Sequence, residues 1–357
     1  MHSISFLLPG ICHKPTGGTK IVLEYANRLA KSGYDVHLVY PVSVFFRKES
    51  IFWKAISVSK LFRFHNKYST NQWFNLDISI KEHLAYSLNY RHVPHTDKYM
   101  ATGVQTAYYL SDYPIDSRNK FYIIQDYEVW AMCEDDVKKS YRLPLNRIVI
   151  SKWLKEVVER EGVECYLVPN GFDFSQFYLT IPIEKKNKYM VSMQYHIRPA
   201  KGIKEGLQTL YKVKETIPQL EVNLFGIYYP KEPLPDWIHF FYNPDDKCHN
   251  YINNISAIYL GSSKLEGWGL TVGEAMMCGQ AVVCTDNKGY LEMATDKISA
   301  LISPVDNVNS LANNIIKLIN DDNLRYIIAN NGHKHIKQFS YDKSFNLFKN
   351  ILELSDN

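Results

Sequence analysis

Short apolar runs alternate with segments of helical spacing along most of this chain. Helical spacing is clear in the first such segment, where Ile21, Val22, Tyr25 and Leu29 recur on one face. The runs that we expect to form strands are residues 4–9, 121–124, 167–168, 191–193, 222–225, 238–241, 257–260 and 281–284. Further helices are expected from Ala200 onward, over 311–319 and over 341–354. Strands that alternate with helices are typical of parallel sheets built from β-α-β units.

The length of 357 residues suggests two domains, each large enough to bury its own core. We expect the first domain over 1–177, a polar linker over 178–188, the second domain over 189–340 and a separate helical segment over 341–357. The expected fold class is therefore α/β, with two Rossmann-like domains on parallel sheets.

A stretch from Glu266 to Asp286 combines acids, glycines and a buried strand. Gly267 and Gly269 allow a tight loop whose backbone amides can approach a ligand. Thr271 is expected to cap a helix that carries Glu274, and the positive end of such a helix favours a diphosphate. The alternative is that both glutamates are ordinary solvated acids near a helix start.

Upstream, the strand at 191–193 leads into a loop with the basic residues His196, Arg198 and Lys201. Cations at one strand end suit a diphosphate, because each opposite charge at ~4 Å is worth roughly 4 kcal/mol before desolvation is subtracted. The alternative is a solvated basic loop before a helix.

With these residues the chain resembles, over nearly its whole length, the retaining glycosyltransferases of family 4. These enzymes have the GT-B architecture, in which two Rossmann-like domains face a central cleft. The resemblance implies that Glu274 bonds the donor ribose and that Glu266 faces the transferred sugar, surrounded by amides. It further implies that the final helix returns to the first domain. The residues that it assigns to these amides are Gly267, Trp268, Gly269 and Leu270.

The family's diphosphate clamp is an arginine and a lysine five positions apart. Lys201 matches the lysine, whereas His196 occupies the arginine position and Arg198 is displaced by two. The resemblance thus leaves open whether His196 or Arg198 is the second cation. Charge on the leaving diphosphate would be met by these groups and by helix-end amides.

In the first half of the chain, the resemblance places Gly17 and Gly18 beside the donor phosphates and the acceptor; the alternative is a tight turn without a ligand. After the strand at 121–124, many relatives carry a His-Asp pair that faces the donor sugar. Here the pair is Gln125 and Asp126, and glutamine cannot shuttle a proton. The Gln-Asp-Tyr-Glu version resembles enzymes that use deoxysugar donors, rhamnosyltransferases among them; alternatively, Asp126 caps the segment that follows.

Composition and charge limit the classes of partner and the cellular location that we expect for this chain. Hydrophobic content of 46% and charged content of 22% are ordinary for a soluble protein. No apolar run is long enough to span a bilayer. We therefore expect a cytosolic protein. A net charge of +4 does not argue for nucleic acid. Residues 41–70 mix cations with aromatics, which suits an anionic membrane surface that presents a lipid-linked acceptor; alternatively, these aromatics pack in the first domain.

Six scattered cysteines lack zinc-type spacing, and no Asp-x-Asp motif suited to a divalent cation is present, so we expect no disulfide, metal or cofactor. The implied activity is a retaining, metal-independent transfer of a sugar from a nucleotide-diphosphate donor to a hydroxyl of a glycan or lipid-linked acceptor. Surface-polysaccharide assembly is the usual setting of such relatives. Two alternatives remain open: a non-catalytic nucleotide or sugar binding protein, and a dinucleotide oxidoreductase, against which the missing Gly-x-Gly-x-x-Gly counts.

Overall fold

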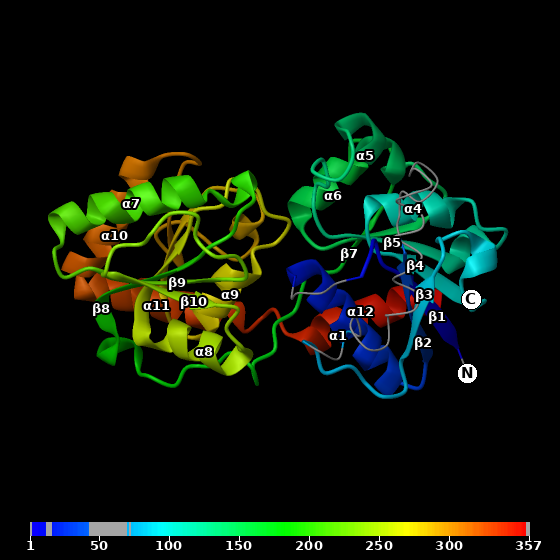
Figure 1. The fold of residues 1–357 in the computed structure, drawn as a ribbon, viewed down its shortest axis with the longest axis horizontal. Helices are drawn as coiled ribbons and strands as arrows, with labels where there is room; N and C mark the ends of the chain where they lie inside the picture. Colours follow the sequence, from blue (N-terminus) through cyan, green and yellow to red (C-terminus); the bar gives the residue numbers. More distant parts are fainter. Residues whose placement is uncertain (1, 12–15, 43–69, 71–72, 355–357) are drawn as a thin grey trace. The chain divides into compact units, whose positions relative to one another are not determined.

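The computed structural model describes residues 2–11, 16–42, 70 and 73–354. The chain divides into two compact units (Figure 1). Unit 1 comprises Met1–Asn170 and Asp342–Asn357, and unit 2 comprises Gly171–Tyr341. Each unit is an α/β structure on a parallel sheet, which confirms the expected fold class.

In unit 1, the described strands form a seven-stranded parallel sheet with the order β3-β2-β1-β4-β5-β6-β7. The strands are β1 (Ser3–Leu7), β2 (Asp35–Pro41), β3 (Lys81–Ala85), β4 (Lys98–Ala101), β5 (Lys120–Ile124), β6 (Asn146–Val149) and β7 (Tyr166–Leu167). The helices are α1 (Gly17–Lys31), α4 (Val104–Ser111), α5 (Glu134–Tyr141), α6 (Lys152–Glu159) and α12 (Tyr341–Glu353). The central strands are buried along their length, as a parallel sheet covered by helices requires.

The last helix, α12, lies with α1 of unit 1 (Figure 1). The rings of Tyr25 on α1 and Phe348 on α12 stack at 4.4 Å and 7°, and both side chains are fully buried. Arg28 adds an ion pair to Asp342 at 2.6 Å. The apolar residues of the last helix, α12, therefore pack against helix α1 in the core of unit 1.

In unit 2, the sheet has the order β10-β9-β8-β11-β12-β13, and all pairs are parallel. The strands are β8 (Asn187–Gln194), β9 (Glu221–Gly226), β10 (Ile238–Tyr242), β11 (Ser256–Gly261), β12 (Ala281–Thr285) and β13 (Ala300–Ser303). The helices are α7 (Ile203–Thr216), α8 (Asp246–Ile255), α9 (Leu270–Met277), α10 (Val308–Asn320) and α11 (Asp322–Ile336). Helix α7 packs beside α10, and α8 lies on the other face of the sheet (Figure 1).

The strand order of unit 2 reverses between β8 and β11. From β8 the chain adds β9 and β10 on one side, and then β11, β12 and β13 on the other. In open parallel sheets, ligands bind outside the carboxyl ends of the strands at such a switch point. The loops that follow β8 and β11 are the two segments that carry the candidate residues of unit 2.

The boundary between the units falls at Asn170 rather than at 177. Residues after Gly171 belong to unit 2 because their backbone bonds to it: the Phe172 amide donates to the Phe339 carbonyl at 3.0 Å, and the Tyr178 amide donates to Asn250 Oδ1 at 3.1 Å. The expected linker over 178–188 is likewise part of unit 2. Its Lys186 ammonium is buried and donates to the last carbonyls of α8 at 3.0 and 2.7 Å.

None of the described helices is long and apolar enough to cross a membrane. Most of the basic and aromatic segment at 41–70 lies outside the residues that the structure describes. Its proposed contact with a membrane surface stays a prediction.

Candidate functional site

Two loops meet at the switch point of unit 2 because Gly202 has no side chain. Gly202 has a φ of +60°, and a Cβ there would collide with the carbonyl oxygen of Ser262. The Lys264 amide also donates to the Ala200 carbonyl at 2.7 Å. These contacts hold the loop after β8 against the loop after β11. They bring Lys201 of the first loop to Glu266 of the second.

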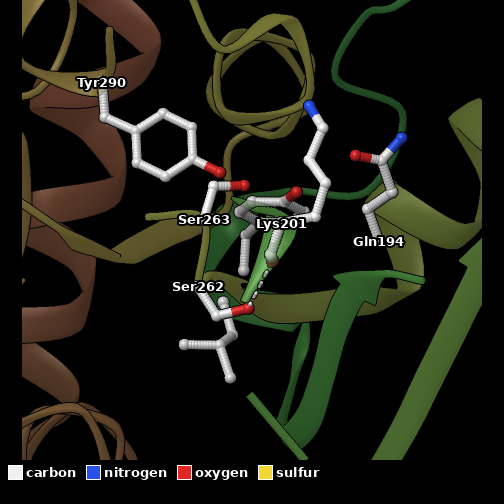
Figure 2. Close-up of a pocket in the computed structure, with 7 residues that line it drawn as sticks. Gln194, Lys201, Ser262, Ser263 and Tyr290 are labelled. Atoms are coloured by element: carbon white, nitrogen blue, oxygen red, sulfur yellow. Dashed lines mark hydrogen bonds between the residues drawn. The ribbon is translucent and has the colours of Figure 1, made fainter. Parts of the chain in front are cut away.

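The ammonium of Lys201 donates to both carboxylate oxygens of Glu266, at 2.7 and 2.8 Å. The two side chains are 25% and 12% exposed. Ser263 Oγ donates to the same carboxylate at 2.7 Å. Figure 2 shows Lys201, Ser263, Tyr290 and Gln194 around a polar cavity of about 10 Å³, which is the space of a single water molecule. The structure therefore brings together two of the candidate residues, Lys201 and Glu266.

The glycine-rich loop leads directly into α9. Gly269 has a φ of +101° and is the residue before the first helical residue, Leu270. Thr271 does not cap this helix, contrary to expectation, because it lies one position inside it. Its hydroxyl instead hydrogen-bonds the Tyr259 hydroxyl at 2.8 Å. Helix α9 thus starts four residues after Glu266, and a helix start carries backbone amides that favour an anion.

Trp268 differs from the other loop residues. Its side chain is buried, with the indole packed edge-on against Phe339 at 5.3 Å. Its indole Nε1 is buried and has no hydrogen-bond partner among the described residues. The sequence alone does not distinguish this buried ring from a ring that stacks on a ligand.

Glu274 lies in the second half of α9, and its side chain is 14% exposed. Its carboxylate is 4.0 Å from the Nε2 of His249, a ring that packs against Phe225. Burial raises the pKa of the Tyr259 hydroxyl, and the charges of Glu266 and Glu274 add smaller contributions to that rise.

His196 is not a cation at neutral pH. Burial, together with the positive charges of Lys201 and Arg198, lowers the pKa of its ring to about 4. Its Nδ1 accepts a hydrogen bond from the Arg198 amide at 3.0 Å, so we assign the ring proton to Nε2. The ring also packs edge-on against Tyr228. The lowered pKa of His196 favours Arg198 over His196 as the second cation, which the sequence left open.

The candidate residues of the first half of the chain lie in unit 1. Gly17 and Gly18 are the first residues of α1, and a Cβ on Gly18 would be 3.4 Å from Gln125 Nε2. Gln125 Oε1 is buried and has no hydrogen-bond partner within the described ranges. Asp126 accepts from the Tyr127 amide at 2.9 Å and from the indole of Trp130 at 3.2 Å, so its carboxylate bonds to the segment that follows it without capping a helix.

Sequence reasoning assigned no role to Glu128, which follows these residues. Its side chain is nearly buried, and Oε2 accepts from the Val104 amide at the start of α4 at 2.5 Å. Burial raises the pKa of this carboxyl to about 7, with a smaller contribution from the charge of Asp126, while the hydrogen bond from Val104 opposes the rise. The sequence pattern does not show whether an acid at the end of a motif, such as Glu128, is buried or exposed.

Across the described part of the chain, no three His, Cys, Asp or Glu side chains are grouped so that they could hold a metal ion. The groups that could meet the charge of a phosphate in unit 2 are Lys201, Arg198 and the backbone amides before α9.

Residues 180–335 match the family model described as glycosyl transferases group 1. A phosphatidyl-myo-inositol mannosyltransferase of Mycolicibacterium smegmatis is 25% identical over 51% of this chain and 50% of the relative. The O-antigen chain mannosyltransferase B of Escherichia coli is 31% identical over 30% of this chain and 27% of the relative. The chain thus spans half or less of the length of these relatives.

Solved structures resemble the chain over its full length. HepE of Anabaena, determined in complex with UDP-glucose, has a TM-score of 0.72 at 17% identity and covers 100% of both chains. Sucrose-phosphate synthase from Thermosynechococcus elongatus has a TM-score of 0.75 at 14% identity and covers 99% of both. Residues 180–335 therefore match the group 1 glycosyl transferases, and the whole chain has the GT-B fold.

Proposed function

We propose that this protein is a glycosyltransferase that moves a sugar from a nucleotide-diphosphate donor to a hydroxyl acceptor. The observation that carries the proposal is the bidentate contact of Lys201 with Glu266 at the switch point of unit 2, beside the start of α9. A cation and a helix start suit a diphosphate, and a carboxylate suits sugar hydroxyls. The family match over residues 180–335 supports the same activity.

In the free protein, Lys201 and Glu266 neutralise each other. We propose that an arriving donor separates them, so that the ammonium moves to the diphosphate and the carboxylate accepts from sugar hydroxyls. The contact between Lys201 and Glu266 is then replaced by two charged contacts, one of Lys201 with the diphosphate and one of Glu266 with the sugar. These two contacts offset the loss of the ion pair. His196 would donate its Nε2 proton to a phosphate oxygen, and Glu274 would bond the ribose.

Lys201 would also act on the leaving group. Negative charge develops on the diphosphate as the bond to the sugar breaks, and a positioned ammonium stabilises that charge more than it stabilises the bound donor. Arg198 is proposed as the second cation, because His196 is neutral. The amides of Gly267, Trp268, Gly269 and Leu270 complete the donor contacts.

The finer features of the reaction rest on the resemblance. We propose retention at the anomeric carbon without a metal ion, and we assign no enzyme nucleophile. Gly17, Gly18, Gln125 and Asp126 are proposed contacts to the donor sugar or acceptor. The unpartnered Oε1 of Gln125 supports this role, since a sugar hydroxyl would satisfy it. A deoxysugar such as rhamnose is proposed as one class of donor sugar.

The acceptor is proposed to be a glycan or lipid-linked saccharide in surface-polysaccharide assembly. A cytoplasmic protein with a peripheral contact to an anionic membrane through residues 41–70 would suit that acceptor. The names of the two mannosyltransferases and the UDP-glucose complex of HepE suggest GDP-mannose and UDP-glucose as first donors to test.

The test is release of nucleoside diphosphate from UDP-glucose, GDP-mannose and dTDP-rhamnose, with and without glycan acceptors. We expect one donor to be turned over and Lys201→Met to lower that turnover by about two to three powers of ten. Lys204→Met removes the same charge from an exposed position three residues away and is the matched control. Binding of a donor without turnover under any condition would support a non-catalytic binding protein, and nicotinamide binding would support an oxidoreductase.

A further inference from the structure

Helix α9 of unit 2 contains a buried glycine at its centre. Gly273 lies between Val272 and Glu274. Glycine is less favourable than alanine inside a helix, so this residue does not favour the helix itself. A Cβ at this position would collide with the ring of Phe172, at its Cζ, Cε1 and Cε2. The absence of a side chain therefore lets α9 lie directly on that ring.

Phe172 is held in place by its backbone. Its side chain is 4% exposed, its amide donates to the Phe339 carbonyl at 3.0 Å, and its carbonyl accepts from the Tyr341 amide at 3.3 Å. A Cβ on Gly171 would collide with the backbone of Tyr341, so a glycine also allows this close pairing. Gly171 and Tyr341 are the first and the last residue of unit 2. The segments by which the chain enters and leaves unit 2 are thus paired with each other, and Phe172 has a fixed position in that pair.

The same pair of segments contacts the loop before α9. The indole of Trp268 packs edge-on against the ring of Phe339, with 5.3 Å between the centroids and 81° between the planes. Trp268 comes just before the start of α9 at Leu270, whereas Gly273 lies at the centre of the helix. The paired segments therefore support α9 at two points, the loop before it and its centre.

We propose that Phe172 is a positioning residue for the donor nucleotide, because its ring sets where α9 lies. The proposal rests on the proposed function, in which Glu274 of α9 bonds the ribose and the amides at the start of the helix bind the diphosphate. Phe172 packs against Gly273 and acts on the nucleotide only through the helix. Because binding groups must be held to within about 0.5 Å, a helix displaced by the width of a methyl group would lose these contacts.

Two substitutions test this packing from its two sides. Gly273→Ala places a methyl group where the ring lies, and alanine favours a helix more than glycine does, so a loss of binding cannot come from helix propensity. We expect it to weaken nucleotide binding about 10- to 100-fold, the range for one lost hydrogen bond to a charged group.

Phe172→Leu removes the three ring atoms that the new methyl group would meet. Alone, it leaves a gap beside α9 and should weaken nucleotide binding about 2- to 10-fold, as for one neutral hydrogen bond. Combined with Gly273→Ala, it relieves the collision. The double variant should therefore bind the nucleotide about 5-fold or more tighter than Gly273→Ala alone, because the two residues are in contact and their effects do not add.

The experiment is calorimetric titration of wild type, Gly273→Ala, Phe172→Leu and the double variant with UDP, GDP and dTDP, the nucleotides of the donors in the panel above. Thermal melting reports folding and stability. Val213→Ala, at a fully buried position on α7, is the matched control. It should lower the melting temperature and keep the Kd of wild type, which separates the position of α9 from the stability of unit 2.

A wild-type Kd for folded Gly273→Ala, or a double variant that binds no tighter than Gly273→Ala, would overturn the positioning role. If Gly273→Ala does not fold, Phe172→Leu decides, and a Kd equal to that of wild type would overturn the role. A folded wild type that binds none of the three nucleotides and turns over no donor would overturn the proposed function. That outcome is distinct from a wild type that binds a nucleotide and a Gly273→Ala variant that binds it equally well.

Discussion

The buried carboxyl of Glu128 should make unit 1 sensitive to pH. Its side chain is 7% exposed and accepts from the Val104 amide at the start of α4. Burial is the main cause that raises its pKa to about 7, and Asp126 adds to it. The change Glu128→Gln keeps the shape and an oxygen that can accept from Val104, and it removes the charge.

The sign follows from the direction of the shift. The pKa of Glu128 in the folded protein lies above its ordinary value of 4.5, so the folded state retains a proton that the unfolded chain has released between these values. The contribution of Glu128 to the free energy of unfolding therefore falls as the pH rises from about 4.5 to about 7. It stays at this lower level at higher pH. At about 1.4 kcal/mol per pH unit, the full loss is about 3 kcal/mol.

Urea denaturation of wild type and Glu128→Gln, followed between pH 5 and pH 8, measures this loss. The variant should gain about 2 to 3 kcal/mol relative to wild type across that range. Glu164→Gln makes the same change at an exposed position and should show no such gain. Parallel pH profiles of wild type and Glu128→Gln would refute the reasoning, because they would mean that Glu128 titrates alike in the folded and unfolded chain.

Three further predictions concern the proposed site and the core. Glu274→Gln should weaken calorimetric binding of the cognate nucleoside diphosphate about 10- to 100-fold, the range for a hydrogen bond to a charged group, and an unchanged affinity would contradict the ribose contact. Gly269→Ala should cost about 2 kcal/mol or more, because its φ is +101° and the new Cβ meets the ring of Tyr290; an unchanged melting temperature would argue against that packing. Phe348→Ala should cost about 3 to 5 kcal/mol of stability in denaturant unfolding, since its ring is fully buried against Tyr25, and a loss below about 1 kcal/mol would contradict the docking of α12 on α1.

Eight of the thirteen described strands were predicted from the sequence because each of them is a short apolar run between polar segments, whereas β2, β3, β4, β6 and β13 were not predicted. The run at 257–260 corresponds to β11, Ser256–Gly261, and the run at 222–225 corresponds to β9, Glu221–Gly226. Parallel strands buried on both faces carry this signal strongly. The proximity of Lys201 and Glu266 could also be predicted from the sequence. Each residue follows a strand, and the two strands end at the same edge of a sheet.

The contacts that shape the site depend on packing that no local pattern encodes. Nothing in the sequence distinguishes Gly202 from the other glycines. In the structure this position requires a glycine, because a Cβ would collide with the carbonyl oxygen of Ser262. Thr271 has the chemistry of a helix cap, but the positive φ of Gly269 starts the helix two residues earlier. The sequence pattern places His196 among basic residues, and only the structure shows that burial and the charges of Lys201 and Arg198 lower its pKa.

The measurement that tests the central claim most directly is a crystal structure with the nucleoside diphosphate that most raises the melting temperature. The account predicts that Lys201 Nζ leaves Glu266 and lies within hydrogen-bond distance of a phosphate oxygen, beside the start of α9. A structure in which the nucleotide is bound elsewhere, with the contact between Lys201 and Glu266 intact, would contradict it.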